Sequence, residues 1–270
     1  MDEPRQPVTR ICHSTPQDVF VRGKSLTGEL IGKVGFVQML YLQILGRQPT
    51  AGQVAMLDAC LVTIMEHGLT PTAITTRMTY TSAPESLQGA VAAGLASVGS
   101  LFVGTMEGCA ALLAEIVAAQ DADERAQAIV AEHRSAGRRL PGFGHPLHKP
   151  DDPRTPVLLA VADEHGIAAD HVHALHRLAH AVDAAYGRHI TINATGAIAA
   201  TLLDCGIPPE IMRGFALIAR CAGLVGHIRE EQTEPAMAAL WHAAEQAVPY
   251  ARPDRQSDRQ PEDPDQGPQR

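Results

Sequence analysis

The chain has 270 residues, of which 45% are hydrophobic and 19% are charged. This balance is typical of a globular protein of one or two domains with a sizeable core. The net charge of -8 excludes a general nucleic-acid-binding protein, although an acidic protein can still hold a local basic pocket for an anionic ligand. Aromatic residues make up only 4%, which favours helices over a β-sandwich. We expect an all-α fold.

The five cysteines are dispersed and form no CxxC pair: Cys12, Cys60, Cys109, Cys205 and Cys221. An odd, scattered set argues against a disulfide framework and for a reducing compartment. The first ten residues are polar and lack the apolar segment of a signal peptide. No apolar run reaches membrane-spanning length without a break. We therefore expect a cytoplasmic protein that does not associate with membranes.

Helical periodicity follows an irregular segment that ends near residue 26 and holds a strand or turn around 19–23. The apolar spacing predicts helices over 30–45, 51–66, 71–80, 84–102, 155–165, 170–185, 193–204, 209–231 and 235–245, with two more within 104–138. Asp170 and Asn193 are suited to cap the N-termini of two of these helices. Residues 251–270 contain no large apolar residue and are expected to be disordered.

The predicted helix over 84–102 is unusually rich in glycine and alanine. Small side chains allow a helix to pack very closely against another. Such a helix could lie in a subunit interface, or it could be a tightly packed helix inside the core.

A loop over residues 140–153 interrupts the helices, and its histidine is followed by two basic residues. Gly142 and Gly144 allow the backbone to approach a ligand closely. His145 is suited to pass a proton near neutral pH. Lys149 offers a point charge for phosphate, and Arg154 offers a planar fork for a carboxylate. Together they predict a site for a substrate that is both acidic and phosphorylated.

This segment resembles the signature of the citrate synthase superfamily, which is G-[FY]-G-H followed by D-P-R. The residues Gly142-Phe143-Gly144-His145 and Asp152-Pro153-Arg154 match it, and the nine-residue spacing from His145 to Arg154 is also the family's. The resemblance extends over roughly 21–253. It implies a large helical domain (1–108 plus 193–250), a smaller inserted helical domain (109–192) and a homodimer.

The resemblance also implies a role for each matching residue. His145 would polarise the keto oxygen of oxaloacetate during condensation, or accept the hydroxyl proton of a citryl thioester during cleavage. Substrate carboxylates would be bound by His67, Arg154, Arg220 and Arg252, the last reaching towards a partner subunit. The coenzyme A thioester would be bound by Gly142, Phe143, Gly144 and Lys149. For each arginine, a solvated surface charge is the alternative interpretation.

The sequence departs from the family at Glu107, where the synthases carry a histidine that hydrogen-bonds the enol oxygen of acetyl-CoA. An ionised carboxylate would repel a developing enolate. A protonated carboxyl, with its pKa raised by burial, could donate the same hydrogen bond. Alternatively, Glu107 is a base for a different proton, or has a structural role such as pairing with Arg77 or Arg154.

A second departure lies in Asn193-Ala194-Thr195-Gly196. Family members that cleave citryl-CoA carry an aspartate directly before this glycine, and that aspartate moves the proton on the thioester carbon. Thr195 cannot serve as such a base at neutral pH. Asn193 and Thr195 therefore enter the candidate site only as lining residues.

We expect an enzyme that cleaves a citryl-CoA-like thioester to acetyl-CoA and oxaloacetate, or that catalyses the reverse condensation. It would need no metal and no tightly bound cofactor, because hydrogen bonds and the thioester stabilise the enolate. His173, His176 and His180 share a helical face, but no acidic or cysteine partner joins them at ligand spacing. The alternatives are an enzyme for a different acyl-CoA and keto acid, or a non-catalytic homologue that binds CoA esters.

Overall fold

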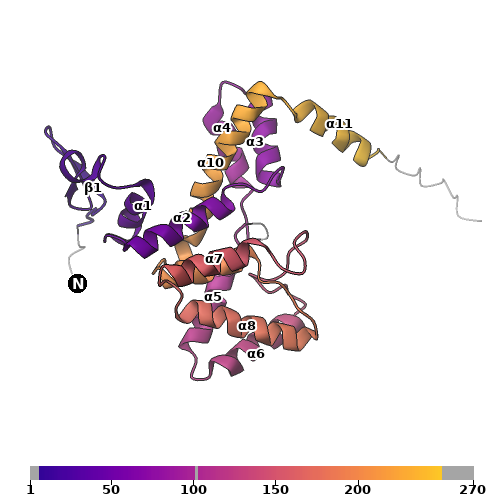
Figure 1. The fold of residues 1–270 in the computed structure, drawn as a ribbon. Helices are drawn as coiled ribbons and strands as arrows, with labels where there is room; N and C mark the ends of the chain where they lie inside the picture. The colour runs from indigo at the N-terminus through magenta and orange to yellow at the C-terminus, as the bar shows by residue number, and fades with distance from the viewer. Residues whose placement is uncertain (1–5, 101–102, 251–270) are drawn as a thin grey trace, which may run out of the picture.

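The computed structural model describes residues 6–100 and 103–250, and its fold is mostly helical, which confirms the all-α prediction. Figure 1 shows a long central helix, α10, running from the middle of the molecule to one end, and α11 projecting away from the body. The helices are α1 (Phe36–Leu45), α2 (Ala51–Met65), α3 (Pro71–Ser82), α4 (Leu87–Ala96), α5 (Thr105–Ala118), α6 (Ala122–Ser135), α7 (Arg154–Glu164), α8 (Asp170–Tyr186), α9 (Ala194–Asp204), α10 (Met212–Thr233) and α11 (Met237–Ala247).

A small antiparallel sheet precedes the helices. Its strands are β1 (Cys12–Ser14), β2 (Val19–Val21) and β3 (Lys24–Ser25), in the order β1-β2-β3. Val21 pairs with Cys12 on one side and with Lys24 on the other. The predicted strand or turn around residues 19–23 is thereby confirmed, as the second strand and the turn into the third.

The first helix starts later than its apolar pattern predicts. Leu26–Leu30 forms a turn of π-helix, Gly32 has a positive φ of 74°, and α1 begins only at Phe36. The C-terminal end near Leu45 agrees with the prediction, because Gly46 takes the left-handed conformation that commonly ends a helix. The apolar residues before Phe36 instead pack with β2 in a small separate cluster.

The glycine- and alanine-rich helix α4 packs closely against α3 and α10. A Cβ atom on Gly94 would lie 2.8 Å from the backbone oxygen of Thr72 and 2.8 Å from a methyl carbon of Leu224. The face that carries Gly94 is therefore packed inside the chain. The helix ends at Ala96 rather than 102.

Capping agrees with the sequence at one of the two predicted positions. The Asn193 side chain accepts a hydrogen bond from the N–H of Gly196 and caps α9. Asp170 was expected to cap α8, but it is the first residue inside that helix. The cap comes instead from Asp204 at the end of α9, whose carboxylate accepts N–H bonds from Ala169, His171 and Val172 at 3.0 to 3.1 Å.

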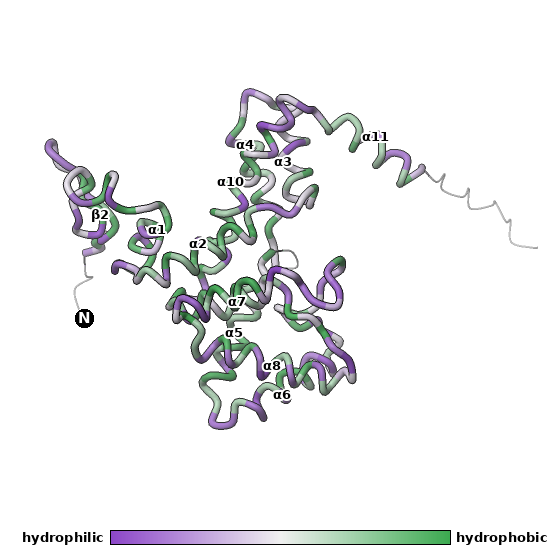
Figure 2. Tube along the Cα trace, viewed as in Figure 1, coloured by the Kyte–Doolittle hydropathy of each residue, from purple (hydrophilic) through white to green (hydrophobic). Residues whose placement is uncertain are grey.

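One hydrophobic cluster runs through α1, α2 and α5 to α10, and includes fully buried side chains such as Tyr41, Leu113, Leu175 and Phe215. Figure 2 shows hydrophobic residues along the central helices and hydrophilic ones at many of the outer turns. Because the cluster is continuous, the division into 1–108 with 193–250 and 109–192 stays a prediction. The predicted tail over 251–270 lies outside the described residues.

The helical segment Pro209–Thr233 is long and apolar enough to cross a membrane by length and composition alone, with a mean hydropathy of 1.4 over its most apolar window. The expectation that no run reaches this length was therefore wrong. In the structure α10, which makes up most of this segment, packs against α2, α3 and α4 and carries buried Arg220 and Glu231. These contacts are those of a core helix.

Candidate active site

The loop that carries the predicted motif is held by the segment leading into α9. Phe143 and Ile192 form an isolated antiparallel bridge. The N–H of Gly144 donates to the carbonyl of Thr191 at 2.8 Å, and the N–H of Asn193 donates to the carbonyl of Gly142 at 3.0 Å. The Asn193 side chain also donates to the carbonyl of Gly144 at 2.9 Å. This strand-like pairing fixes the backbone directly before His145.

Two glycines allow this loop to lie directly on the helices beneath it. Gly142 has a φ of 85°, and a Cβ there would lie 2.5 Å from Cys109 Sγ on α5. A Cβ on Gly196 of α9 would lie 2.6 Å from the Gly142 carbonyl oxygen. Gly196 is therefore required for packing of the loop, and Cys109 serves as a small buried residue beneath it.

His145 is fixed by its own loop. Its Nδ1 accepts the N–H of Leu147 at 3.2 Å and the N–H of His148 at 3.0 Å. An Nδ1 that accepts hydrogen bonds carries the lone pair, so the neutral ring has its proton on Nε2. Burial, followed by the positive charge of His148, lowers the pKa of His145. The geometry thus presents a neutral N–H donor, which suits polarising an oxygen better than accepting a proton.

Three imidazoles gather at this point: His67 after α2, and His145 and His148 in the loop. The rings of His145 and His148 stack with centroids 4.3 Å apart. The ring of His67 meets them edge-on, with centroids 5.7 Å from His145 and 5.8 Å from His148. One nitrogen from each ring lies within 4.8 Å of the other two. The family resemblance predicted His67 and His145 here, whereas His148 was not among the predicted site residues.

Three close histidines are also ligands of the kind that transition metals prefer. Their geometry fits an ion poorly, because a metal lies in the plane of each ring that binds it. The rings of His145 and His148 are stacked with planes only 24° apart, whereas a shared ion would have to lie in both planes. The Nδ1 lone pair of His145 is also already occupied. A site without a metal stays a prediction.

Arg154 opens α7 and is oriented by Asp152, a residue that the sequence motif contains but to which we had given no role. The Asp152 carboxylate is fully buried and accepts from Arg154 Nε at 2.9 Å and Nη2 at 2.8 Å. Burial alone would raise the pKa of Asp152, but hydrogen bonds from Arg154 and from the N–H of Ala194 lower it to about 2. The carboxylate therefore holds Arg154 in place, leaving its remaining N–H groups for a ligand.

Arg220, on α10, is 4% exposed and unsatisfied. Its Nε and Nη1 are buried without a hydrogen-bond partner among the described residues. The Glu66 carboxylate lies 3.8 Å from Nη1, which is too long for a hydrogen bond. Buried charged groups are normally paired and hydrogen-bonded. The side chain is thus built to meet an anion that a ligand would supply.

Positive charge surrounds His67 as well. Burial, followed by the positive charge of Arg154, lowers the pKa of His67, and His148 and Arg220 act in the same direction. The charges of Arg154 and Arg220 therefore act on His67, whose ring lies beside that of His145. The buried Arg77 is paired with Glu230 and Glu231 and donates to His227 Nδ1 at 3.0 Å. This network supports α3 against α10.

Glu107 lies in the first turn of α5, where the helix dipole favours a negative charge. Its carboxylate forms an ion pair with the guanidinium of Arg213 on α10 and accepts the backbone N–H of Arg213 at 3.3 Å. Neither suggested partner contacts it, because Arg77 pairs with Glu230 and Glu231, and Arg154 pairs with Asp152. Of the alternatives left open for Glu107, this arrangement favours the structural ion pair, with Arg213 as the partner.

Thr195 is committed to local hydrogen bonds. Its hydroxyl donates to Asn193 Oδ1 at 2.7 Å and lies 2.9 Å from the hydroxyl of Thr105 on α5. Asn193 itself joins α9 to Gly144 of the loop. Both residues thus support the loop from below.

The remaining predicted residues are less fixed. Lys149 is exposed in the loop, where it can reach a phosphate without being held by a protein partner in the described part of the chain. Phe143 packs on the core beside the bridge to Ile192. Arg252 lies outside the described residues.

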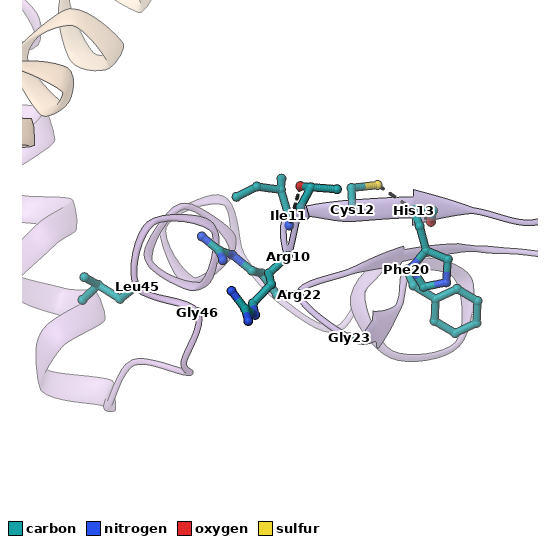
Figure 3. Close-up of a pocket in the computed structure, with 10 residues that line it drawn as sticks. Arg10, Ile11, Cys12, His13, Phe20, Arg22, Gly23, Leu45 and Gly46 are labelled. Carbon is teal, nitrogen blue, oxygen red and sulfur yellow. Dashed lines mark hydrogen bonds between the residues drawn. The ribbon is translucent and has the colours of Figure 1, made fainter. Parts of the chain in front are cut away.

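Two pockets are lined by residues other than those predicted for the site. One, of about 590 Å³, is lined by Arg10, His13, Arg22 and Leu45, among others, and is shown in Figure 3. Arg22 there is used structurally, because its guanidinium donates to the carbonyl of Gln43. The other, of about 500 Å³, is a mostly apolar groove between α1, α2 and α10. Neither pocket contains any of the predicted site residues, and the active site at the histidine cluster stays a prediction.

The helical fold and the loop motif place the chain in the citrate synthase class of proteins. Residues 29–242 match the family model described as citrate synthase, C-terminal domain, and the chain belongs to this family. It is similar to a citrate synthase of Haloferax volcanii, with 25% identity over 189 residues, which are 69% of this chain and 48% of that protein. The chain thus spans about half the length of the curated relatives that it matches.

Solved structures support the same assignment. The structure of citryl-CoA lyase from Hydrogenobacter thermophilus matches with a TM-score of 0.82 and 31% identity, over 92% of this chain and 95% of that one. An ATP citrate lyase from Methanothrix soehngenii, in complex with citrate and coenzyme A, matches with a TM-score of 0.77 and 19% identity, over 94% of this chain and 43% of that one. The second likeness shows the fold alone.

Proposed function

We propose that the chain is a carbon–carbon lyase that cleaves a citryl-CoA-like thioester to acetyl-CoA and oxaloacetate, or catalyses the reverse condensation. The observation that carries this proposal is Arg220, a buried guanidinium whose Nε and Nη1 lack partners. It stands with Arg154 and His67 around the neutral N–H of His145. Arg154, Arg220 and His67 can bind the carboxylates of a polycarboxylate. The N–H of His145 can polarise its central oxygen.

In this proposal Arg154, Arg220 and His67 bind the carboxylates, and the Nε2–H of His145 donates to the oxygen on C3. Gly142, Phe143 and Gly144 form the wall along which the thioester lies, and Lys149 meets a phosphate of coenzyme A. Coenzyme A enters as part of the substrate. Glu107, paired with Arg213, holds α5 against α10 and is not assigned to the enolate.

The test is a turnover assay by mass spectrometry. Purified protein is given citryl-CoA, and separately acetyl-CoA with oxaloacetate, alongside the His145→Ala and Arg220→Met variants. We expect cleavage by the wild type above uncatalysed hydrolysis, and a loss of at least about a hundredfold in each variant. No turnover by the wild type in either direction would reject the citryl-CoA assignment. Thermal stabilisation by coenzyme A would then favour another acyl-CoA or a binding role.

A homodimer in the cytoplasm completes the proposal. Helix α11 projects from the body in Figure 1, and it exposes Trp241 at 69% and Val248 at 79%. Large apolar side chains on a projecting helix are suited to contact a second copy of the chain. The cysteines, all of which are free, agree with a reducing compartment.

A further inference from the structure

Cleavage of a citryl thioester needs a group that removes the proton from the C3 hydroxyl. The groups that the sequence analysis considered at this site are committed to other contacts. Glu107 is paired with Arg213, and the Thr195 hydroxyl is bonded to Asn193. His145 holds its Nδ1 lone pair against two backbone N–H groups, which leaves only a proton on Nε2. The site therefore needs another base if the proposed lyase function, on which this inference rests, is to proceed.

His148 is the group placed to supply it. Its ring stacks on that of His145 at 4.3 Å, and one of its nitrogens lies within 4.8 Å of a nitrogen of His145 and of His67. Among the residues that the structure describes, the imidazole of His148 makes no hydrogen bond. It is half-buried at the edge of the cluster, so it can meet both substrate and water.

We infer that His148 is a catalytic residue, which accepts the C3 hydroxyl proton while the N–H of His145 polarises the same oxygen. The O–H electron pair becomes the second bond of the keto group, and the C2–C3 bond breaks. Its electron pair moves into the thioester as an enolate. The His148 imidazolium then returns a proton to C2, directly or through water. Oxaloacetate and acetyl-CoA leave, and every atom and electron is accounted for without an oxidant or reductant.

His67 is the other imidazole that could be considered for this step. The positive charges of Arg154 and Arg220 act on it. His67 in that position suits a bound carboxylate, because the guanidinium groups of Arg154 and Arg220 attract the same anion. Asp152, the acidic residue beside the cluster, is fully buried and used by Arg154. His148 is the remaining base that meets His145.

The experiment compares His148→Leu and His148→Ala with His176→Leu, which replaces an exposed histidine on α8 and serves as the matched control. Each variant is checked for an unchanged melting temperature and for its dissociation constant for oxaloacetate. Turnover of citryl-CoA is then measured, and imidazole is added to His148→Ala as a replacement base. The exchange of acetyl-CoA methyl protons with deuterated water is followed in parallel.

We expect kcat to fall by about a hundredfold or more in both His148 variants, because a positioned acid–base contributes that much. Oxaloacetate binding should stay within about threefold of the wild type, and imidazole should restore part of the kcat of His148→Ala. The inference is overturned if wild-type turnover survives within about threefold in His148→Leu, or if the loss lies wholly in KM. The lyase proposal stands in that case. A wild type with no turnover would instead reject both the lyase function and the role of His148.

Discussion

Asp152 is the residue on which the position of Arg154 depends. Replacing it with asparagine removes the bidentate acceptor and leaves the guanidinium facing a neutral amide. We expect Asp152→Asn to lower the free energy of unfolding by about 2 kcal/mol, since a partly buried ion pair loses one member. We also expect kcat/KM to fall between about tenfold and about a hundredfold, because Arg154 is misplaced. Chemical denaturation and steady-state kinetics check the two effects.

The neighbouring Asp151 provides a matched control. Its side chain is 66% exposed and lies 2.9 Å from the imidazole of His189. Exposed ion pairs of this kind contribute little, so Asp151→Asn should leave stability and kcat/KM close to wild type. Equal losses in the two variants would show that the loop, and not Arg154, depends on these carboxylates.

The histidine pKa values set the expected pH dependence. Burial and neighbouring positive charge lower the pKa of His145 and of His67 below the ordinary value of 6.5. Both rings are therefore neutral at pH 7. As pH falls through the lowered pKa of His145, its Nδ1 gains a proton. That proton points at the N–H groups of Leu147 and His148, so both hydrogen bonds are lost. We expect kcat/KM to be level from about pH 6.5 to about pH 8 and to fall below that range.

The free energy of unfolding should also decrease as pH falls. Between the lowered pKa values and 6.5, the unfolded chain binds more protons than the folded one, so these two groups destabilise the fold as pH decreases. A pH profile of kcat/KM at constant ionic strength measures the functional effect. A lower limb that lies above pH 7 would contradict the assignment of neutral rings to His145 and His67.

The pairing of Glu107 with Arg213 can be measured with a double-mutant cycle on Glu107→Gln and Arg213→Met. Both side chains are partly exposed, at 26% and 33%, so we expect a coupling energy of about 1 kcal/mol. If Glu107 only holds α5 against α10, kcat in Glu107→Gln should stay within about tenfold of wild type. A loss of a hundredfold with stability intact would restore a chemical role for this carboxylate.

At the scale of elements, the contact between the loop and α9 depends on Gly196. An added methyl group would lie 2.6 Å from the Gly142 carbonyl and would have to displace the backbone that positions His145. We expect Gly196→Ala to lower the free energy of unfolding by about 1 to 3 kcal/mol, and to reduce kcat/KM with it. Thermal unfolding and kinetics on the purified variant measure both.

The same substitution at Gly214 is the control. This glycine lies in α10, and a Cβ there would meet nothing within 4 Å. Alanine should therefore stabilise the helix by about 0.5 to 1 kcal/mol and leave kcat/KM unchanged. An unchanged Gly196→Ala variant would mean that the loop can move without consequence for the site.

Helix positions were predictable from local pattern, and their ends were predictable where one residue decides them. Gly46 ends α1 and Asn193 starts α9 as the sequence indicates. The start of α1 could not be predicted, because a π-helical turn and Gly32 interrupt an apolar run that looks continuous. The cap of α8 was also missed. It comes from Asp204, which accepts a hydrogen bond from the N–H of Ala169, 35 residues earlier in the chain. Local periodicity contains no information on such a partner.

The candidate site divides in the same way. His145, Arg154 and the glycines belong to one short motif, and their grouping could be read from it. The pairing of Glu107 with Arg213 joins positions 106 residues apart, so only the packing of α5 on α10 reveals it. His148 shares the loop with His145, and the signal available was a second histidine three residues along. Its meaning depended on the stacking of the two rings.

At the scale of the whole molecule, the proposed homodimer can be followed with Trp241, the only tryptophan in the chain. In the isolated protomer its side chain is 69% exposed. If α11 docks on a second copy, the indole is removed from water, and its emission shifts to shorter wavelength as protein concentration rises. Fluorescence across a dilution series, together with sedimentation velocity, gives the dissociation constant.

The Trp241→Glu variant tests whether this contact holds the assembly. A charge placed in an apolar interface should favour the monomer, with the melting temperature of the protomer unchanged because Trp241 contributes little to its core. Emission that is independent of concentration, with a monomeric mass throughout, would reject the arrangement.

The loop that carries His145 is held at its two ends by the helices and exposed between them. Gly142 to His145 is tied to α9, and Asp152 with Arg154 is tied to α7, whereas Leu147 is 74% exposed and its neighbours Pro146 and Lys149 are also exposed. Substitutions at these three positions cost the fold little. They flank His145 and His148 in the loop. Under the proposed function, natural drift or a laboratory library confined to them would change which thioester is accepted while the scaffold persists, which makes this short stretch the place where new specificity can arise.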